Sequence, residues 1–485
     1  MESSVFLDRG TDNRHHKTTM RLKLFQRRPK KPLLAPEHKT VHTHKIETLK
    51  AGRLASLALD FTSRLIEQLG PRLATSESAQ KAAEQIEQEY QKFCDYTQSS
   101  SVAVDMDIHR LPLKVVPIIY PVILLFLFFG LPYLGLILFS LYCYYVYRVL
   151  YLYKPFSYKK QKKKQGVNVH GVLHPSEEVR QTILFTAHHD SAPLYRYNQL
   201  NRLSYAKKVA LPVALFGVTG ILCFLQVLVE LMSRTLLMPN MPSLVLALLH
   251  LLLLSCSPFL FSLKHFYHEE ASPGAGDNLA SVALTVQLSR YFHWKRACGQ
   301  PLKHTRLYFC SFDAEEFALQ GSRAWFQEMA PSLENALVLN FDSLYYADAL
   351  TFLEKDVNAS VELSSLLARR CVEIARSMGY EAKSEAIPRL AGGTDAAEAS
   401  RAGLQACTLT SVGWDDRSKP SVYHTKDDNV SAIEVKAIEQ AISVGIRLVE
   451  LSEAGQLWEE GLEEPSPEEK LEEEPKLIFS KLTNR

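Results

Sequence analysis

The sequence has no bulk excess of charge of either sign. Its 485 residues contain 55 Lys and Arg against 53 Asp and Glu, which gives a formal net charge of +2. This balance supplies no electrostatic basis for binding a polyanion, so we expect no nucleic-acid partner. The chain is also longer than one ordinary domain and has room for a large buried core.

Paired cysteines and an early apolar stretch are absent as well. The eight cysteines show no CxxC spacing, and Cys143, Cys223 and Cys256 fall inside apolar runs. This pattern predicts buried reduced thiols rather than a zinc knuckle or a disulfide framework. The first apolar stretch begins only after residue 114, so we expect no cleavable secretory signal.

Both ends of the chain are poor in large apolar residues. Basic residues crowd positions 1–45, and glutamate dominates the stretch from Glu453 to Glu474. Segments of this composition cannot bury enough apolar surface to offset the entropy of ordering. We therefore predict a disordered basic N-terminus at 1–45 and a disordered acidic tail at 455–485.

Three long apolar runs stand out, at Val115–Tyr147, Val209–Met232 and Leu244–Leu263. About 20 apolar residues suffice to cross a bilayer as a helix, so the second and third runs each fit one span. The first is long for one span, and Gly130, Pro132 and Gly135 break it midway, which favours a hairpin of two short helices. The sequence thus predicts four transmembrane helices in two hairpins, 111–153 and 206–265, with a lipid bilayer as partner.

The segments between the apolar runs, 46–110, 154–205 and 266–454, are predicted to form one α/β domain. Apolar residues repeat every three or four positions from Glu77 to Phe93, as in an amphipathic helix. Strand-like runs alternate with helical stretches and lie at Thr182–Thr186, Arg306–Phe312, Ala336–Phe341 and Ala406–Thr410. Such alternation favours a sheet covered by helices on both faces.

Polar residues gather where these strands end. In TAHHDS, His188 and Asp190 are two residues apart, so on a strand both side chains point to the same side and the carboxylate can orient the imidazole. In GAGDN, Asp277 lies on a glycine-rich turn just before a helix. A carboxylate placed there can bridge two cations.

Further candidate ligands follow along the chain. FDAEE ends a strand with the adjacent carboxylates Glu315 and Glu316, which point in different directions and can divide the roles of base and ligand. ALVLNFD ends at Asp342, and SVYHTKDDN presents His424 in a polar loop. Two imidazoles with three carboxylates suit zinc. Each motif alone is weak, because an isolated HxD, EE or loop histidine is more often structural.

The order of these motifs resembles the M28 family of metallopeptidases, which includes zinc aminopeptidases, glutamate carboxypeptidases and glutaminyl cyclases. The resemblance covers roughly residues 46–110, 155–205 and 266–452. It implies a zinc aminopeptidase-like fold, a three-layer α/β/α sandwich with a mixed, mostly parallel sheet, here interrupted by the two transmembrane hairpins. One departure from the family pattern is the insertion of two apolar runs between the HxD motif and the bridging aspartate.

The resemblance also implies a role for each motif residue. His188 and Asp342 would hold one zinc, Glu316 and His424 the second, and Asp277 would bridge them. Glu315 falls at the general-base position, and Asp190 matches the residue that orients the first histidine. None of these seven residues is replaced. Further candidates, for which surface or packing roles stay open, are Tyr423, Arg417 and Asp395.

Three functional hypotheses follow. The leading one is a dizinc aminopeptidase-like hydrolase acting on peptides, and its nearest alternative is a glutaminyl cyclase with a single zinc. The third is a non-catalytic membrane scaffold of the same fold. A hydrolase of this kind would use a zinc-activated water, with Glu315 taking its proton.

Charge next to the apolar runs predicts topology. Lysines crowd 154–164 and recur at Lys207 and Lys208 beside Arg202, whereas the opposite loop carries only Arg234. By the positive-inside rule, both termini and the catalytic domain are expected in the cytoplasm. Only 19 residues separate Asp190 from Val209 and 14 separate Leu263 from Asp277, so we expect the site to open close to the bilayer, unless the hairpin is merely an anchor.

Overall fold

The computed structural model of the chain describes residues 51–156, 163–197, 202–233, 242–414, 419 and 422–459. The predicted disorder of 1–45 lies outside the described residues, and so does that of the tail beyond 459. The same holds for the side chain of Arg202 and for five residues used above: Lys159, Lys160, Lys162, Arg234 and Arg417.

The main sheet follows the order β1-β2-β6-β3-β7-β11-β8-β10, with β9 paired to β8. Its strands are β1 (Tyr96–Val104), β2 (Lys164–Leu173), β3 (Gln181–His188), β6 (Thr305–Phe312), β7 (Leu337–Leu344), β8 (Leu350–Asp356), β9 (Val361–Glu362), β10 (Ala382–Ala386) and β11 (Gln405–Ser411). The four runs predicted as strands are therefore strands β3, β6, β7 and β11. They are adjacent at the centre of the sheet.

Parallel pairing joins these central strands, while antiparallel pairing lies on both sides of them. The predicted mixed sheet is confirmed. In the described part of the chain, the antiparallel pairings of this sheet are as numerous as the parallel ones. The flanking strands β1, β2 and β9, which make most of the antiparallel pairings, were not predicted because they carry too much polar sequence to be recognised as strands.

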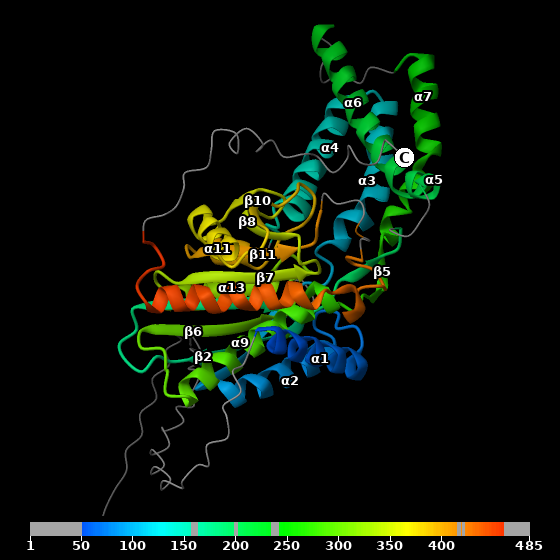
Figure 1. Ribbon diagram of the computed structural model, residues 1–485. Coiled ribbons are helices and arrows are strands. Elements are labelled where there is room, and N and C mark those ends of the chain that lie inside the picture. The colour runs from blue at the N-terminus through cyan, green and yellow to red at the C-terminus, as the bar shows by residue number, and fades with distance from the viewer. Residues whose placement is uncertain are drawn as a thin grey trace, which may run out of the picture. The chain divides into compact units, whose positions relative to one another are not determined.

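Alternation of side chains along the central strands builds two cores. Phe185 and Phe309 stack on one face with ring centroids 5.9 Å apart, whereas Leu184 and Tyr308 face the other. The first face is covered by α1 (Ala51–Leu69), α2 (Glu77–Phe93), α9 (Ala280–Ala297), α11 (Ser365–Ser377) and α13 (Val435–Glu453), and the second by α10 (Gln320–Met329) and α12 (Ala396–Arg401). The three-layer arrangement is visible in Figure 1, where α13 runs along strands β6 and β7.

The predicted helix at Glu77–Phe93 is confirmed as α2. Its first turn is capped by Ser76, whose side chain accepts a hydrogen bond from the Ala79 backbone N–H at 3.1 Å. Its buried residues repeat at helical spacing, and they include Ala82, Ile86 and Tyr90. The Tyr90 hydroxyl reaches Thr285 on α9 at 2.8 Å, which ties these two helices together beneath the sheet.

Four helices are long and apolar enough to cross a membrane by length and composition: Arg110–Phe128, Pro132–Tyr151, Leu203–Met232 and Leu244–His265. They comprise α3 (Arg110–Phe128), α4 (Pro132–Val146) with η1 (Tyr147–Tyr151), α5 (Arg202–Tyr205) with η2 (Ala206–Ala210) and α6 (Leu211–Met232), and α7 (Leu244–Ser255) with α8 (Ser257–Leu260) and η3 (Leu263–His265). The expected break in the first run occurs at Gly130, where φ is +70° and the chain turns into Pro132.

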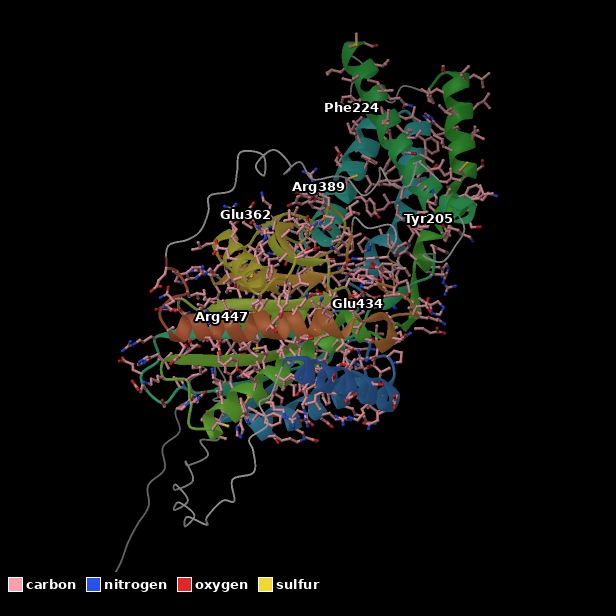
Figure 2. The ribbon with its side chains drawn as sticks, in the orientation of Figure 1. Tyr205, Phe224, Glu362, Arg389, Glu434 and Arg447 are labelled. Atoms are coloured by element: carbon pink, nitrogen blue, oxygen red, sulfur yellow. The ribbon has the colours of Figure 1, made fainter. Side chains whose placement is uncertain are left out.

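These helices expose apolar side chains that a water-soluble surface would bury. Phe224 on α6 is 52% exposed and Leu244 at the start of α7 is 76% exposed. Figure 2 shows Phe224 on this bundle, whereas labelled charged residues such as Glu362 and Arg447 lie on elements of the α/β domain.

Short elements join the bundle to the α/β domain. β4 (Pro193–Tyr195) and β5 (Tyr267–Ala271) form a two-stranded antiparallel sheet with Tyr195 opposite Tyr267. The remaining turns are η4 (Ala275–Leu279), η5 (Ala330–Ser332) and η6 (Val430–Ala432).

Candidate metal centre

The predicted ligands come together at one edge of the sheet. Strand β3 ends at His188, the chain leaving β6 carries Glu315 and Glu316, and Asp342 lies near the end of β7. These three strands are adjacent and parallel, so their carboxyl ends meet at the same edge. All seven residues named from the sequence lie in this region. Six of them are buried, and Glu316 is partly exposed.

The first group of possible ligands forms around His188. Its Nε2 lies 3.3 Å from Asp277 Oδ1 and 3.8 Å from Asp342 Oδ2. One ligand atom from each of these three residues falls within a common sphere that suits a metal ion. The Oε2 atom of Glu315 lies 3.7 Å from the same nitrogen, close to this group.

The second group of possible ligands lies on the other side of Asp277. Nε2 of His424 is 3.0 Å from Asp277 Oδ2 and 3.3 Å from Glu316 Oε2. Asp277 therefore directs one carboxylate oxygen to each histidine. The two groups share this single residue, which is the arrangement expected of a bridging carboxylate.

A rigid turn places Asp277 between the histidines. The backbone N–H groups of Gly276 and Asp277 donate to the Asp428 carboxylate at 2.8 and 3.3 Å. The Asn278 side chain donates to the Phe341 carbonyl at 2.9 Å, which fastens the turn to β7. A Cβ atom on Gly276 would lie 2.1 Å from the ring of Tyr345, so only glycine fits there. The peptide bond between Asp277 and Asn278 is cis.

Asp190 holds the His188 side of the site together. One carboxylate oxygen lies 3.3 Å from His188 Nδ1, and the Asp190 carbonyl oxygen is 3.2 Å from the same nitrogen. The carboxylate also accepts hydrogen bonds from the backbone N–H groups of Glu315 at 3.2 Å and Glu316 at 3.3 Å. A single buried carboxylate thus orients one imidazole and fixes the backbone that carries both glutamates.

The electrostatics of the site favour a bound cation. Four carboxyl groups, from Asp277, Glu315, Glu316 and Asp342, face only two imidazoles. Burial, together with the neighbouring carboxylates, raises the pKa of the Glu315 and Asp342 carboxyls well above their usual range. Burial opposes protonation of His424, but Glu316 and Asp277 outweigh it and raise its pKa to about 10. A divalent cation would relieve this crowding of negative charge.

Unsatisfied polar atoms give an independent test of whether a metal fits. His188 Nε2, Asp277 Oδ2, Glu316 Oε1 and His424 Nε2 are buried, and they make no hydrogen bond within the described residues. Buried polar atoms normally have such a partner, so a cluster of them facing one another points to metal ligands. Imidazole nitrogens combined with carboxylate oxygens are a donor set that zinc accepts.

Several residues that support the site were missed by the sequence analysis. Arg72 is fully buried and donates to the carbonyl oxygens of His189 at 2.9 Å and Gly274 at 2.8 Å, so it joins the two loops that carry His188 and Asp277. Asp428, within the same SVYHTKDDN segment as His424, anchors the Asp277 turn. Nothing in the sequence immediately around Arg72 or Asp428 indicates these long-range contacts.

Two of the three further candidates, Asp395 and Tyr423, lie near the proposed ligands. Both carboxylate oxygens of Asp395 are buried without a hydrogen-bond partner in the described residues, and burial raises the pKa of this carboxyl to about 7. The Tyr423 ring stacks on His424, with centroids 3.9 Å apart. Arg417 lies outside the described residues.

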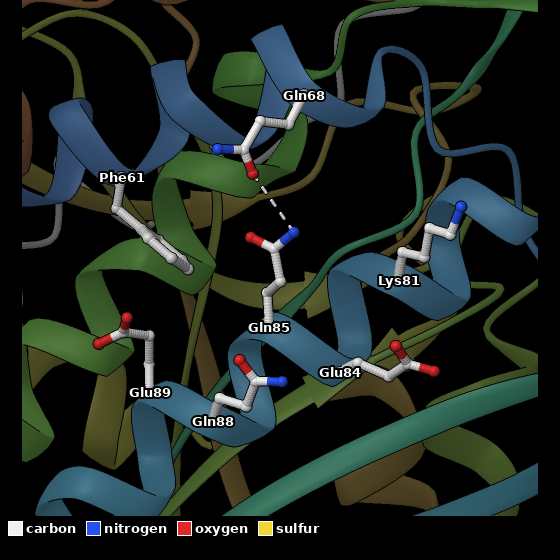
Figure 3. A pocket seen from close by; sticks show the side chains of 7 residues that line it. All are labelled: Phe61, Gln68, Lys81, Glu84, Gln85, Gln88 and Glu89. Carbon is white, nitrogen blue, oxygen red and sulfur yellow. Dashed lines mark hydrogen bonds between the residues drawn. The ribbon is translucent and has the colours of Figure 1, made fainter.

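A groove remote from this centre is of a different character. It lies between α1 and α2, and Figure 3 shows Gln85 donating to Gln68 across it at 3.4 Å. Its lining is mostly exposed amide and charged side chains, and it contains none of the predicted metal ligands. We assign it no chemistry.

Comparison with known sequences finds a similarity in the second half of the chain. Residues 260–449 match the model of peptidase family M28. A curated relative, a probable glutamate carboxypeptidase from Arthroderma benhamiae, is 35% identical over 95 residues. That alignment covers 19% of this chain and 12% of the relative.

Solved structures whose backbone is similar to that of this chain include three bacterial enzymes. A Zn-dependent exopeptidase from Parabacteroides distasonis is 14% identical, with 81% of this chain and 97% of that chain covered and a TM-score of 0.47. A zinc aminopeptidase from Bacillus subtilis is 12% identical, with coverage of 82% and 94% and a TM-score of 0.47. A glutaminyl cyclase from Bacteroides thetaiotaomicron is 11% identical, with coverage of 81% and 97% and a TM-score of 0.47. Residues 260–449 of the chain are thus similar to peptidase family M28.

Proposed function

We propose that this protein is a membrane-bound dizinc peptidase that removes residues from the amino end of peptides. The observation that carries the proposal is the shared carboxylate of Asp277, which faces His188 on one side and His424 on the other. His188, Asp277 and Asp342 would hold one zinc, and Asp277, Glu316 and His424 the other. When bound, zinc ions of this kind activate water and polarise a carbonyl at neutral pH.

Glu315 is proposed as the general base. It lies 3.7 Å from His188 Nε2 and could form a third ligand group with His188 and Glu316, but it belongs to neither group that contains Asp277. We therefore assign its carboxylate to take a proton from the attacking water and pass it to the leaving amine. Asp190 is proposed as a positioning residue. Its contacts to His188 and to the Glu315 N–H keep base and ligand in a fixed relation.

The polar groups of the site favour the amino end of a substrate. No lysine or arginine side chain makes an ion pair with the candidate ligands in the described residues. Two zinc ions would offset the charge of the four carboxylates. A substrate carboxylate then finds no cationic side chain at these ligands, whereas the Glu315 carboxylate can accept a hydrogen bond from a terminal amino group. This supports aminopeptidase over carboxypeptidase activity.

Membrane attachment is supported by the four apolar helices and by their exposed apolar side chains. Lys154, Lys207 and Lys208 adjoin the ends of the helices nearest the α/β domain. By the positive-inside rule, these lysines support a cytoplasmic catalytic domain. In right-side-out vesicles, the catalytic domain should resist an added protease until the vesicles are permeabilised. Cleavage of the domain in intact vesicles would contradict this topology.

Two matched peptides test the reaction. Purified full-length protein should release free leucine from a leucyl peptide, and a zinc chelator should stop the release. The same peptide with an amino-terminal glutamine separates hydrolysis from cyclisation, because hydrolysis adds water whereas cyclisation expels ammonia. Cyclisation of the glutaminyl peptide with no release of leucine would replace the proposal with the glutaminyl cyclase hypothesis. An inert, metal-free protein would favour the scaffold hypothesis.

A further inference from the structure

Three tyrosines beside the metal centre come from the connections to the apolar helices. Tyr153 is the second residue after the helix Pro132–Tyr151, and Tyr267 is the second after the helix Leu244–His265. Tyr195 belongs to β4, eight residues before the helix that starts at Leu203. Two extended residues reach no more than about 7 Å, so Tyr153 and Tyr267 are held at the ends of these helices.

The same three tyrosines face the candidate ligands. The Tyr195 ring lies edge-on to His424 with centroids 5.0 Å apart, and the Tyr267 ring meets Tyr195 at 5.7 Å. Burial and the nearby Glu315 carboxylate raise the pKa of Tyr153. Burial and the Glu316 carboxylate do the same for Tyr267. Tyr195 therefore contacts a candidate ligand, Tyr267 packs against Tyr195, and both Tyr153 and Tyr267 lie near enough to a glutamate for its carboxylate to act on their phenols.

The remaining apolar helix reaches the same place. His109 precedes the helix Arg110–Phe128, and its ring packs against Tyr153 with centroids 5.2 Å apart. Arg110 donates to the His268 carbonyl at 3.1 Å, which links the first of the four helices to the residue after Tyr267. Ends of three of the four apolar helices thus lie at the aromatic rim, defined as Tyr153, Tyr195 and Tyr267.

Fixed contacts keep this rim in place. The Tyr153 carbonyl accepts a hydrogen bond from Arg323 at 2.8 Å, and Arg323 is itself paired with the buried Glu398 at 2.8 Å. On the opposite side, β4 and β5 pair in register at Tyr195 and Tyr267. Tyrosines at helix ends are common where a helix leaves a bilayer, but such rings usually face lipid headgroups. Here the Tyr195 ring contacts His424 of the candidate metal centre, and the Tyr267 ring packs against Tyr195.

Resting on the proposed peptidase function, we infer that the natural substrates are peptides held at the membrane surface, whose free amino end enters past the aromatic rim. A peptide anchored in the bilayer is confined near the rim, so its effective concentration at the pocket is raised without any new contact. The rings provide an apolar wall for the first side chain of such a peptide. A soluble peptide gains neither local concentration nor orientation.

The test uses the full-length chain in phosphatidylcholine vesicles and one leucyl peptide in two forms, both added from outside. One form is soluble, and the other is coupled at its carboxyl end to phosphatidylethanolamine through a spacer. We expect kcat/KM for the anchored form, expressed per total peptide, to exceed that for the soluble form by about tenfold or more. The advantage should shrink as the spacer is lengthened.

A substitution in the aromatic rim, compared with a matched control, separates a role in substrate approach from a role in folding. Tyr267→Ser should lower the ratio of anchored to soluble kcat/KM, whereas Tyr96→Ser, at a 50% exposed tyrosine on β1, should leave the ratio unchanged. A purely structural role of Tyr267 would lower both rates together and keep the ratio. Equal wild-type turnover of the two forms would overturn the inference and leave the peptidase function standing. Turnover of neither form would overturn both.

Discussion

The two halves of the candidate metal centre, on either side of Asp277, are held in different ways. On one side, His188 ends a central strand, and its Nδ1 is fixed by Asp190 at 3.3 Å. On the other, His424 lies in a loop with φ +55°, and its Nδ1 makes no hydrogen bond within the described residues. A left-handed conformation costs a non-glycine residue about 1–2 kcal/mol.

Aromatic packing takes the place of the missing polar anchor at His424. Its ring is stacked on Tyr423 at 3.9 Å and is met edge-on by Tyr195 at 5.0 Å. Because Tyr195 lies on a strand that leads to an apolar helix, this half of the site is connected to the apolar helices. The comparison teaches that one half is oriented by hydrogen bonds from the sheet, and the other by packing against inserted segments.

The largest expected effect separates the two neighbouring glutamates. Glu315→Gln should lower kcat by about a thousandfold with both zincs retained, because it removes the general base but no ligand. Glu316→Ala should instead cost zinc at the His424 half, since Glu316 lies 3.3 Å from His424. Steady-state kinetics and zinc content by mass spectrometry on both variants check this. Substantial turnover by the Glu315→Gln protein would show that the base is another group.

A smaller effect is expected from the polar anchor of the first half. Asp190→Asn keeps the shape of the side chain but weakens its hold on His188, and losing such a partner typically costs about 10–100-fold in metal affinity or activity. Zinc titration should show the loss at one of two sites. The prediction fails if both sites keep wild-type affinity while the variant remains folded.

The smallest effect is expected from the aromatic anchor of the second half. Tyr195→Leu removes a ring contact of the kind worth about 0.5–1.5 kcal/mol, so zinc affinity at the His424 site should fall only severalfold. Tyr195→Phe keeps the ring and serves as the matched control, with wild-type affinity expected. If Tyr195→Phe weakened zinc as much as Tyr195→Leu, the hydroxyl rather than the ring would be the anchor.

The sequence carried enough information to predict the central strands and the ligands that follow them. Buried parallel strands are continuous apolar runs, and the polar residues at their ends stand out against them. His188 and Asp342 were accessible in this way. The flanking strands β1 and β2 were not, because β1 is largely exposed and β2 carries Lys, Gln, Asn, His and Gly among its residues, so neither gives a strong apolar signal.

The supporting contacts could not be predicted, for a different reason. Arg72 belongs to no local sequence pattern, and its backbone N–H donates to the hydroxyl of Ser191, which is 119 residues away. Asp428 contacts Gly276 across 152 residues. The pairing of Tyr195 with Tyr267 depends on a helical hairpin folding back to its starting side. Contacts of this range depend on the tertiary fold and leave no spacing in the sequence.

Reconstitution with zinc tests the central claim most directly. Protein stripped of metal should be inactive towards a leucyl peptide. As zinc is added, leucine release should rise to its maximum at two equivalents per chain, one for each half around Asp277. Full activity at one equivalent, or activity that persists without any metal, would contradict the account.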